Sequence, residues 1–377
     1  MHSICSNQCK NLLVNICQWE LWGFGVSDAT PLVFDGHNDV LLKLFRAGGP
    51  SKAGAFLSGR DGAIDLPMAT RGGFGGGFFA VYVPSPTDLE FKFQEMTKDV
   101  YDLPLPEEIE WEDAMPVVAS QVAILFELER IGALTVCRSA SDIRTALTQK
   151  KIAAIFHIEG AEGIDADLHM LDVLYAAGLR SIGPVWSRPT IFGHGVPFRY
   201  PATPDTGDGL TDHGIRLVKR CNALSIMVDL SHLNEAGFWD VARHSDAPLV
   251  ATHSNVHAIC PHTRNLTDDQ LRAIAESDGM VGLNFAVAFL RADGKMQSDV
   301  PIHQMLRHLD HLLEILGEDR VGLGSDYDGA VVPEDLTTVA ELPTLRQAMA
   351  EHGYDDTLIK KLCHENWLRV LETTWGS

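Results

Sequence analysis

Short apolar runs alternate with amphipathic segments along most of the chain. The apolar runs are rich in β-branched residues and end in polar ones, a pattern typical of strands buried in a parallel sheet. We expect eight such strands, near residues 32–34, 77–83, 152–158, 180–185, 225–230, 248–252, 280–285 and 320–324. Apolar residues at helical spacing predict helices near residues 116–132, 168–177, 214–222, 235–243, 268–276 and 302–316, and two more helices after the last strand.

Two of the expected helices carry capping signals at their ends. Gly178 follows the helix near residues 168–177, in the position where a C-terminal glycine is common. Thr267 and Gln270 have the spacing of a capping box at the start of the helix near residues 268–276. Regular alternation of strands and helices predicts an α/β fold with a parallel sheet.

Metal-type ligands or acids follow five of the predicted strands, the first, third, fifth, sixth and eighth. These residues are His37 with Asp39, Glu159, His232, His253 and Asp326. In an open sheet, ligands gather at one switch point between two strands, whereas all strands of a closed barrel end at one mouth. The pattern therefore favours a (β/α)8 barrel of the TIM type over a doubly wound sheet.

We expect one barrel domain over residues 31–377, preceded by an irregular or weakly helical arm over residues 1–30. The segment 187–213, after the fourth strand, is rich in proline, glycine and aromatic residues. A loop of this length at the mouth of a barrel is usually functional.

Composition narrows the class of partner. The chain has 377 residues and a formal net charge of −21 with no basic cluster, which argues against nucleic acid or an anionic membrane and favours a small-molecule substrate. No apolar stretch is long enough to span a membrane, and no secretory signal or anchor tail is evident, so we expect a cytoplasmic protein. The seven cysteines, an odd number, are expected to be reduced thiols, and Cys5 and Cys9 lack the second pair that a structural zinc site needs.

The residues that follow the strands have the chemistry of a two-metal site. His37 and Asp39 are two apart on a predicted strand, so both side chains leave the same face and could hold one ion. His232 and His253 end consecutive strands and could hold a second ion, and Glu159 could bridge the two with its two oxygens. Two ions about 3.5–4 Å apart would trap a bridging hydroxide and polarise a carbonyl.

Each candidate also has a purely structural interpretation. Asp326 could serve as the group that takes a proton from the water and passes it to a leaving nitrogen. Taken alone, however, a histidine at a strand end is more often hydrogen-bonded than metal-bound, and Asp39 could cap a turn, as we expect for Asp328. His157, one layer deeper than Glu159 on the same face, is interpreted as a core histidine. Five coincidences at strand ends are much rarer than one shared site.

Six segments resemble motifs of the renal (membrane) dipeptidase family, the zinc dipeptidases of the amidohydrolase superfamily (peptidase family M19). In chain order they are Asp35-Gly-His-Asn-Asp39, Ile158-Glu-Gly160, Asp229-Leu-Ser-His232, Thr252-His-Ser254, Thr263-Arg-Asn-Leu266 and Gly324-Ser-Asp-Tyr-Asp-Gly329. The resemblance runs from about residue 31 to residue 372. It implies a distorted (β/α)8 barrel that binds two zinc ions and hydrolyses dipeptides, including those with a D-residue at the C-terminal position.

Carried over residue by residue, the resemblance implies two zinc ions per chain with Glu159 as the bridging ligand. His37 and Asp39 would hold the first zinc, and His232 and His253 would hold the second. The residue types alone also suit manganese or iron. A homodimer is implied by the resemblance only.

The resemblance also assigns the substrate side of the site. It implies that Asp326 is the acid/base and that Arg264 binds the terminal carboxylate of the substrate as a bidentate partner. Mammalian members of the family carry a substrate-contacting histidine where this chain has Trp186, and we expect His194 in the long loop to supply a replacement donor. Cys260 has a family counterpart but no cysteine partner, which, with no lipid-anchor signal, fits a soluble bacterial-type member.

The predicted function is a binuclear zinc dipeptidase for L-Xaa-L-Xaa and L-Xaa-D-Xaa substrates, and two alternatives stay open. One is a hydrolase of the same fold that acts on an N-acyl amino acid, a lactone or a phosphoester; a substrate with a free carboxylate would need Arg264, whereas a phosphotriester would not. The other is a non-peptidase tailoring enzyme or a metal-binding scaffold, which Trp186 favours and the acid/base Asp326 opposes.

Overall fold

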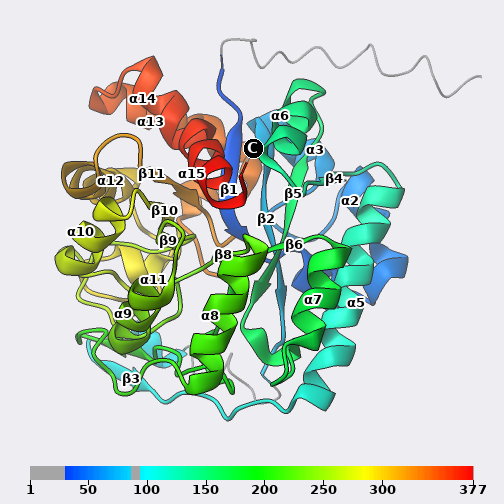
Figure 1. Cartoon of the computed structure of the whole chain (residues 1–377). Coiled ribbons are helices and arrows are strands. Elements are labelled where there is room, and N and C mark those ends of the chain that lie inside the picture. The colour runs from blue at the N-terminus through cyan, green and yellow to red at the C-terminus, as the bar shows by residue number, and fades with distance from the viewer. Residues whose placement is uncertain (1–29, 86–93, 377) are drawn as a thin grey trace, which may run out of the picture. The chain divides into compact units, whose positions relative to one another are not determined.

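The computed structural model describes residues 30–85 and 94–376, which build a ring of parallel strands (Figure 1). The predicted strands are present as β1 (Val33–Asn38), β2 (Phe74–Tyr82), β5 (Ala153–Glu159), β6 (Leu179–Gly183), β8 (Met227–Val228), β9 (Val250–Ala251), β10 (Met280–Asn284) and β11 (Val321–Gly324). They pair in the order β8-β6-β5-β2-β1-β11-β10-β9. A parallel bridge between Asp229 and Val250 brings the two ends together. The prediction of a (β/α)8 barrel is therefore confirmed, and the ring is nearly closed.

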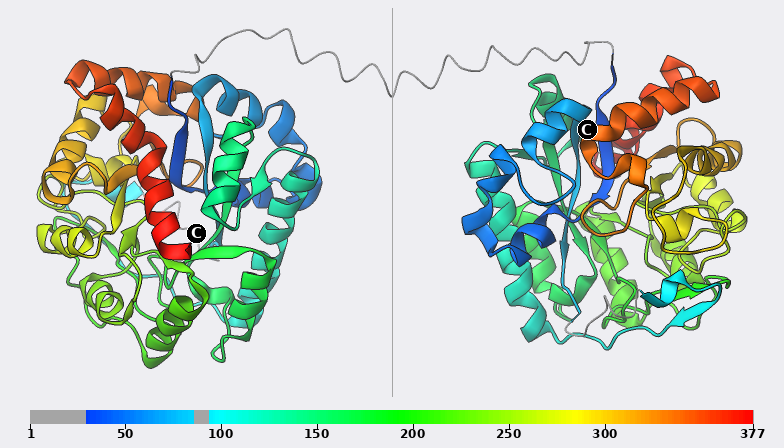
Figure 2. Two further views of the ribbon diagram at one scale, coloured as in Figure 1. Left: turned by 45° about the horizontal axis from the view of Figure 1, so that its top comes forward. Right: turned by 180° about the vertical axis from the view of Figure 1, so that it is seen from behind.

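Helices surround the strands on the outside (Figure 2). The longer ones are α5 (Trp111–Arg130), α6 (Ala140–Thr148), α7 (His169–Ala177), α8 (Asp212–Leu224), α9 (Glu235–His244), α10 (Asp268–Glu276), α12 (Ile302–Leu316), α13 (Leu342–His352) and α15 (Asn366–Trp375). Both predicted capping signals are used: Gly178 ends α7 with a φ of 122°, and Thr267 and Gln270 form a capping box at α10. The fold thus follows the local signals in the sequence.

Several short elements lie outside the predicted alternation. The strands are β3 (Tyr101–Leu103), which pairs antiparallel with β7 (Phe198–Tyr200), and β4 (Thr135–Val136), which pairs with β5. The helical segments are α1 (Val40–Arg46), α2 (Ala55–Ser58), α3 (Leu66–Gly72), α11 (Val287–Leu290), α14 (Asp356–Lys360), the 3-10 turns η1 (Gly49–Lys52), η2 (Gln94–Thr97), η3 (Ala161–Gly163), η4 (Glu334–Leu336) and η5 (Val339–Glu341), and the π-helical turn η6 (Lys361–Glu365). The long loop 187–213 is therefore ordered in part, because β7 lies within it.

Side chains on β5 alternate between the interior of the barrel and the helices around it. Ile155 belongs to the inner apolar cluster, whereas Phe156 and Ile158 belong to the outer one. Since successive residues of a strand face opposite sides, His157 and Glu159 share the inner face with Ile155. The strand thus places Glu159 at its carboxyl end, directly above His157.

The opposite end of the barrel is closed by an aromatic residue from the C-terminal helix. Trp367 of α15 is fully buried in the inner cluster, and its indole N–H donates to the Leu323 carbonyl over 3.0 Å. Figure 2 (left) shows α15, in red, lying across this end. The interior is therefore packed below the site, and the carboxyl ends of the strands form its open mouth.

The structure tests only part of the predictions about the cysteines, the N-terminal arm and membrane-spanning segments. Cys137, Cys221, Cys260 and Cys363 are buried free thiols, whereas Cys5 and Cys9 lie outside the described residues. The predicted N-terminal arm also falls outside them, apart from Thr30, so the division into arm and domain stays a prediction. No helix within the described ranges is both long and apolar enough to cross a membrane.

Candidate metal centre

Five predicted ligands from four strand ends meet at the mouth of the barrel. Among the described residues, His37, Asp39 and Glu159 form one group of potential metal ligands, and Glu159, His232 and His253 form another. All five side chains are buried. Glu159 belongs to both groups, which is the arrangement expected of a bridging carboxylate.

The first group is built where β1 passes into α1. The Nε2 atom of His37 lies 3.4 Å from Oδ2 of Asp39 and 3.5 Å from Oε2 of Glu159. The spacing predicted that Asp39 lies on the strand, and this was wrong. Asp39 lies one residue past the end of β1, in the N-cap position of α1. The turn into the helix still aims its carboxylate at His37.

The second group is formed by the residues after β8 and β9. The Nε2 atoms of His232 and His253 are 3.2 Å apart, and they lie 3.0 Å and 3.6 Å from Oε1 of Glu159. The other ring nitrogen of each histidine is held by a hydroxyl: Ser187 Oγ lies 3.0 Å from Nδ1 of His232, and Thr252 Oγ1 lies 2.8 Å from Nδ1 of His253. Such outer contacts fix the ring and leave Nε2 for a metal ion.

A cation suits the electrostatics of this arrangement. Neither ring nitrogen of His37 has a hydrogen-bond partner among the described residues, although the side chain is fully buried. Burial raises the pKa of Glu159, since no solvent stabilises its charge. Burial also lowers the pKa of His232 and of His253 well below the ordinary value, so both present neutral nitrogens. Neutral imidazoles beside desolvated carboxylates are the donors that zinc and similar ions bind.

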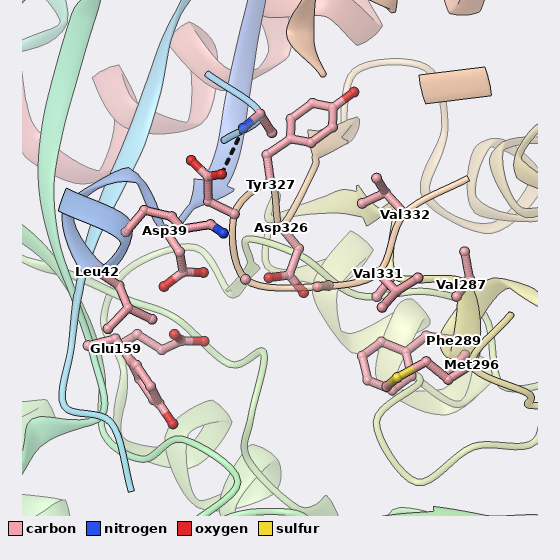
Figure 3. A pocket seen from close by; sticks show the side chains of 18 of the residues that line it. Asp39, Leu42, Glu159, Val287, Phe289, Met296, Asp326, Tyr327, Val331 and Val332 are labelled. Carbon is pink, nitrogen blue, oxygen red and sulfur yellow. Dashed lines mark hydrogen bonds between the residues drawn. The ribbon is translucent and has the colours of Figure 1, made fainter. Parts of the chain in front are cut away.

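Asp326 faces the same space from the loop after β11. Its N–H donates to the His37 carbonyl over 3.0 Å, and its Oδ2 accepts from the Asn284 side chain over 3.2 Å. A β carbon at Gly329 would lie 2.1 Å from Oδ2 of Asp39 and 2.7 Å from Oδ1 of Asp326, so only glycine fits between the two carboxylates. Figure 3 shows Asp39, Glu159 and Asp326 directed toward one cavity. Burial raises the pKa of Asp326.

A cavity of about 740 Å³ opens above these carboxylates. Trp186, the residue in place of the family's histidine, lines it, and its ring centroid lies 5.8 Å from that of His232. Phe198 from β7 also lines it, so the long loop contributes to the wall. His194 is half-buried and is not among the described residues that line this cavity.

Arg264 is buried behind the second histidine group. Its Nη2 donates to the His253 carbonyl over 2.9 Å and its Nη1 to Ser254 Oγ over 2.8 Å, whereas Nε has no partner among the described residues. Burial lowers the pKa of Arg264 to about 10, which leaves it charged near neutral pH. Arg264 is 3% exposed and does not belong to the described lining of the cavity.

Two other predicted residues have clear structural partners. His157 lies under the site, with Nδ1 at 2.9 Å from Ser181 Oγ and its pKa lowered to about 3 by burial. Asp328 accepts hydrogen bonds from Arg60 and from the N–H of Ala63, the latter over 2.8 Å. The sequence did not indicate the partners of Asp328. It also did not indicate the contacts of Ser187, Thr252 and Asn284 with the site, because single serines, threonines and asparagines near strand ends carry no distinctive signal.

Known proteins place this chain in context. It matches the model of the membrane dipeptidase family (peptidase family M19) over residues 26–375. The crystal structure of a metallopeptidase from Rhodobacter sphaeroides, liganded with a phosphinate mimic of the dipeptide L-Ala-D-Ala, is 55% identical with a TM-score of 0.90; the match covers 92% of this chain and 100% of that one. A Klebsiella pneumoniae protein described as an uncharacterized protein in the pqqA 5′ region is 51% identical over 265 residues, 70% of this chain and 98% of that protein. An Acinetobacter calcoaceticus protein described as an uncharacterized protein in the PQQ-III 3′ region is 41% identical over 284 residues, 75% of this chain and 89% of that protein.

The family match spans nearly the whole barrel and includes every strand end that contributes to the candidate metal centre. The chain therefore belongs to the membrane dipeptidase family of metallopeptidases, peptidase family M19.

Proposed function

We propose that this protein hydrolyses the peptide bond of dipeptides, both L-Xaa-L-Xaa and L-Xaa-D-Xaa, with two zinc ions at the metal centre. The observation that carries the proposal is the shared carboxylate: Glu159 belongs to both groups of potential ligands and lines one cavity with Asp326. Membership of the family and the dipeptide mimic bound to the Rhodobacter sphaeroides relative support the choice of substrate.

In this proposal His37 and Asp39 hold one zinc ion, His232 and His253 hold the other, and Glu159 bridges them. Zinc bound there would polarise the scissile carbonyl and provide a water acidic enough to attack it near neutral pH. The five side chains are buried, so they act on the substrate in a medium where water screens their charges weakly.

Asp326 is the group that we propose moves the proton. Its carboxylate would accept a proton from the attacking water as the oxygen bonds to the carbonyl carbon. It would then donate that proton to the leaving nitrogen as the C–N bond breaks. Asn284 would orient the carboxylate through the hydrogen bond to Oδ2.

Two further residues are proposed to contact the substrate. Arg264 would bind the terminal carboxylate, an interaction that its charge and its unpartnered Nε support. His194 would donate a hydrogen bond to the substrate from the long loop. In the described structure it does not line the cavity, so its side chain would have to turn toward the substrate. Unchanged turnover in His194→Ala would remove that residue from the site.

The test compares L-Ala-L-Ala and L-Ala-D-Ala with C-terminally amidated L-Ala-L-Ala, which lacks the carboxylate, in zinc-loaded enzyme. Wild type should hydrolyse both free dipeptides and strongly disfavour the amide. Arg264→Ala should lose about tenfold or more of that preference, and Arg264→Lys, which keeps the charge without the fork, should retain part of it. Equal turnover of the amide by wild type, or no turnover of any dipeptide, would contradict the proposal and favour an amide or ester substrate of another class.

A further inference from the structure

One wall of the cavity carries two cations that the proposed reaction does not use. Lys43 and Arg46 both line the cavity and lie on α1, which starts directly after Asp39. At 1.5 Å of rise per residue, they lie about 6 Å and about 10 Å from Asp39 along the helix axis. Both cations therefore border the cavity within about two helical turns of a proposed metal ligand.

Neither cation has an ion pair or a side-chain hydrogen bond within the part of the chain that the structure describes. Asp328 lines the same cavity, but its carboxylate is already paired with Arg60 and with the N–H of Ala63. The rest of the protein is strongly acidic, with a net charge of −21. Burial raises the pKa of Asp328 and Lys43 helps to lower it, but Lys43 forms no ion pair with that carboxylate. Arg46 is exposed, so both cations stay available to an anionic group in the cavity.

The same two residues occupy the last turn of α1, where cations stabilise a helix through its dipole. That role alone would not require either residue to line the cavity. It predicts that their removal lowers thermal stability and leaves substrate preference unchanged, so the two roles can be separated by experiment.

The opposite wall indicates which end of a dipeptide faces α1. Leu42 of α1 lies on the side of Asp39, whereas Phe289 and Met296 lie across the cavity (Figure 3). The guanidinium carbon of Arg264 is 5.8 Å from the ring centroid of Phe289, so a terminal carboxylate bound by Arg264 would lie toward that wall. The N-terminal residue of the dipeptide then lies toward α1.

We propose that Lys43 and Arg46 form a subsite for an anionic side chain on the N-terminal residue of the substrate, so that dipeptides beginning with Glu or Asp are preferred. This inference rests on the proposed dipeptidase function. Complementary charge of this kind selects among substrates that share the same backbone contacts.

The test compares kcat/KM for L-Glu-L-Ala and L-Gln-L-Ala, which differ in charge and hardly in shape. Zinc-loaded wild type should favour L-Glu-L-Ala by about five- to tenfold, and Lys43→Met and Arg46→Met should each move that ratio toward one. Lys43→Arg keeps the charge and should keep the preference. Lys52→Met removes an exposed cation outside the cavity and is the matched control, with the ratio of wild type.

Equal values for the two substrates in wild type would overturn the inference, as would a preference that survives in both methionine variants. Lower melting temperatures with an unchanged ratio would assign the two cations to the helix dipole alone. A preference for L-Ala-L-Glu over L-Ala-L-Gln, without one at the N-terminal position, would overturn the placement of the substrate. Turnover of any of these dipeptides by wild type separately reports the proposed function, and the absence of turnover of all of them would overturn both.

Discussion

Three carboxylates, those of Asp39, Glu159 and Asp326, face one cavity (Figure 3), where Asp39 and Glu159 are buried and Asp326 is half-buried. Burial raises the pKa of Glu159 and of Asp326 because each charge loses its hydration. Their roles are expected to differ by their neighbours. Glu159 lies between three histidines, whereas Asp326 accepts a hydrogen bond from the neutral amide of Asn284 and stays free to exchange a proton.

Replacing Asp326 with asparagine tests its proposed role in proton transfer directly. Asp326→Asn keeps the shape and an acceptor for Asn284 but cannot carry the proton, so kcat for L-Ala-D-Ala should fall by about 10²- to 10⁴-fold. Metal content should stay at the level of wild type, because Asp326 is not a proposed ligand. Steady-state kinetics and elemental analysis of the same preparation provide both readings. A loss of kcat below about tenfold would show that another group moves the proton.

At the scale of the elements, the strands around the second histidine group approach one another unusually closely. A β carbon at Gly36, Gly282 or Gly324 would lie 2.1, 2.0 or 2.0 Å from the carbonyl oxygen of Thr252. Glycine in a strand interior often marks such an approach of another backbone. Because Thr252 precedes His253 and contacts its Nδ1, the packing of β1, β10 and β11 positions a proposed metal ligand.

Gly282→Ala is therefore expected to disturb both stability and metal binding. The added methyl would push Thr252 away, at an expected cost of about 1 to 3 kcal/mol in the free energy of unfolding. Thermal melts and zinc content measure the two effects. Gly54→Ala is the matched control, because Gly54 has a φ of −58° and no atom within 4 Å of the added carbon. Equal stability of the two variants would mean that the barrel relaxes around the methyl group.

A buried histidine makes the packing of α12 sensitive to acid. His308 accepts from the Val256 N–H over 3.2 Å, and its Nε2 lies 3.0 Å from the Leu290 carbonyl, so the neutral ring joins α12 to the loop at Val256 and to the end of α11. Burial lowers the pKa of His308 to about 4, below the ordinary value of 6.5. The unfolded chain therefore binds the proton more readily than the folded one, and stability falls as the pH drops from 6.5 toward 4.

His308→Gln removes that titration while keeping a donor for the Leu290 carbonyl. Between pH 7 and pH 5, wild type should lose about 1 to 2 kcal/mol more unfolding free energy than the variant. Denaturant titrations of both proteins at the two pH values give the difference. Parallel losses would show that the proton is taken up elsewhere.

At the scale of the whole molecule, closure of the barrel brings residues that are distant in sequence into one centre, and this much could be predicted. Eight predicted strands, five of them followed by metal-type or acidic residues, indicated the ring and its mouth. The short strands β3, β4 and β7 were not predicted, because they lie outside the alternation of strands and helices; β8 and β9 are as short but lie within apolar runs that follow predicted helices. Asp39 was expected on the strand and lies in a helix cap, a shift that a two-residue spacing does not distinguish. The assignment of Arg264 came only from the family resemblance, since a loop arginine has no local signal for a substrate.

The hydroxyls that contact the two histidines also could not be predicted from the sequence. Ser187 lies 45 residues before His232, and their contact exists only once the ring has closed. A single sequence does not specify such pairs, because many serines could occupy that place. The candidate ligands could be proposed because metal-type residues rarely follow five strands of one barrel by chance.

The number of metal ions that supports turnover tests the proposed centre most directly. Metal-free protein is titrated with zinc while hydrolysis of L-Ala-D-Ala is followed. With Glu159 bridging two ions, activity should rise to a maximum at about two equivalents of zinc per chain. A plateau at about one equivalent, or hydrolysis that does not depend on added zinc, would contradict a binuclear site.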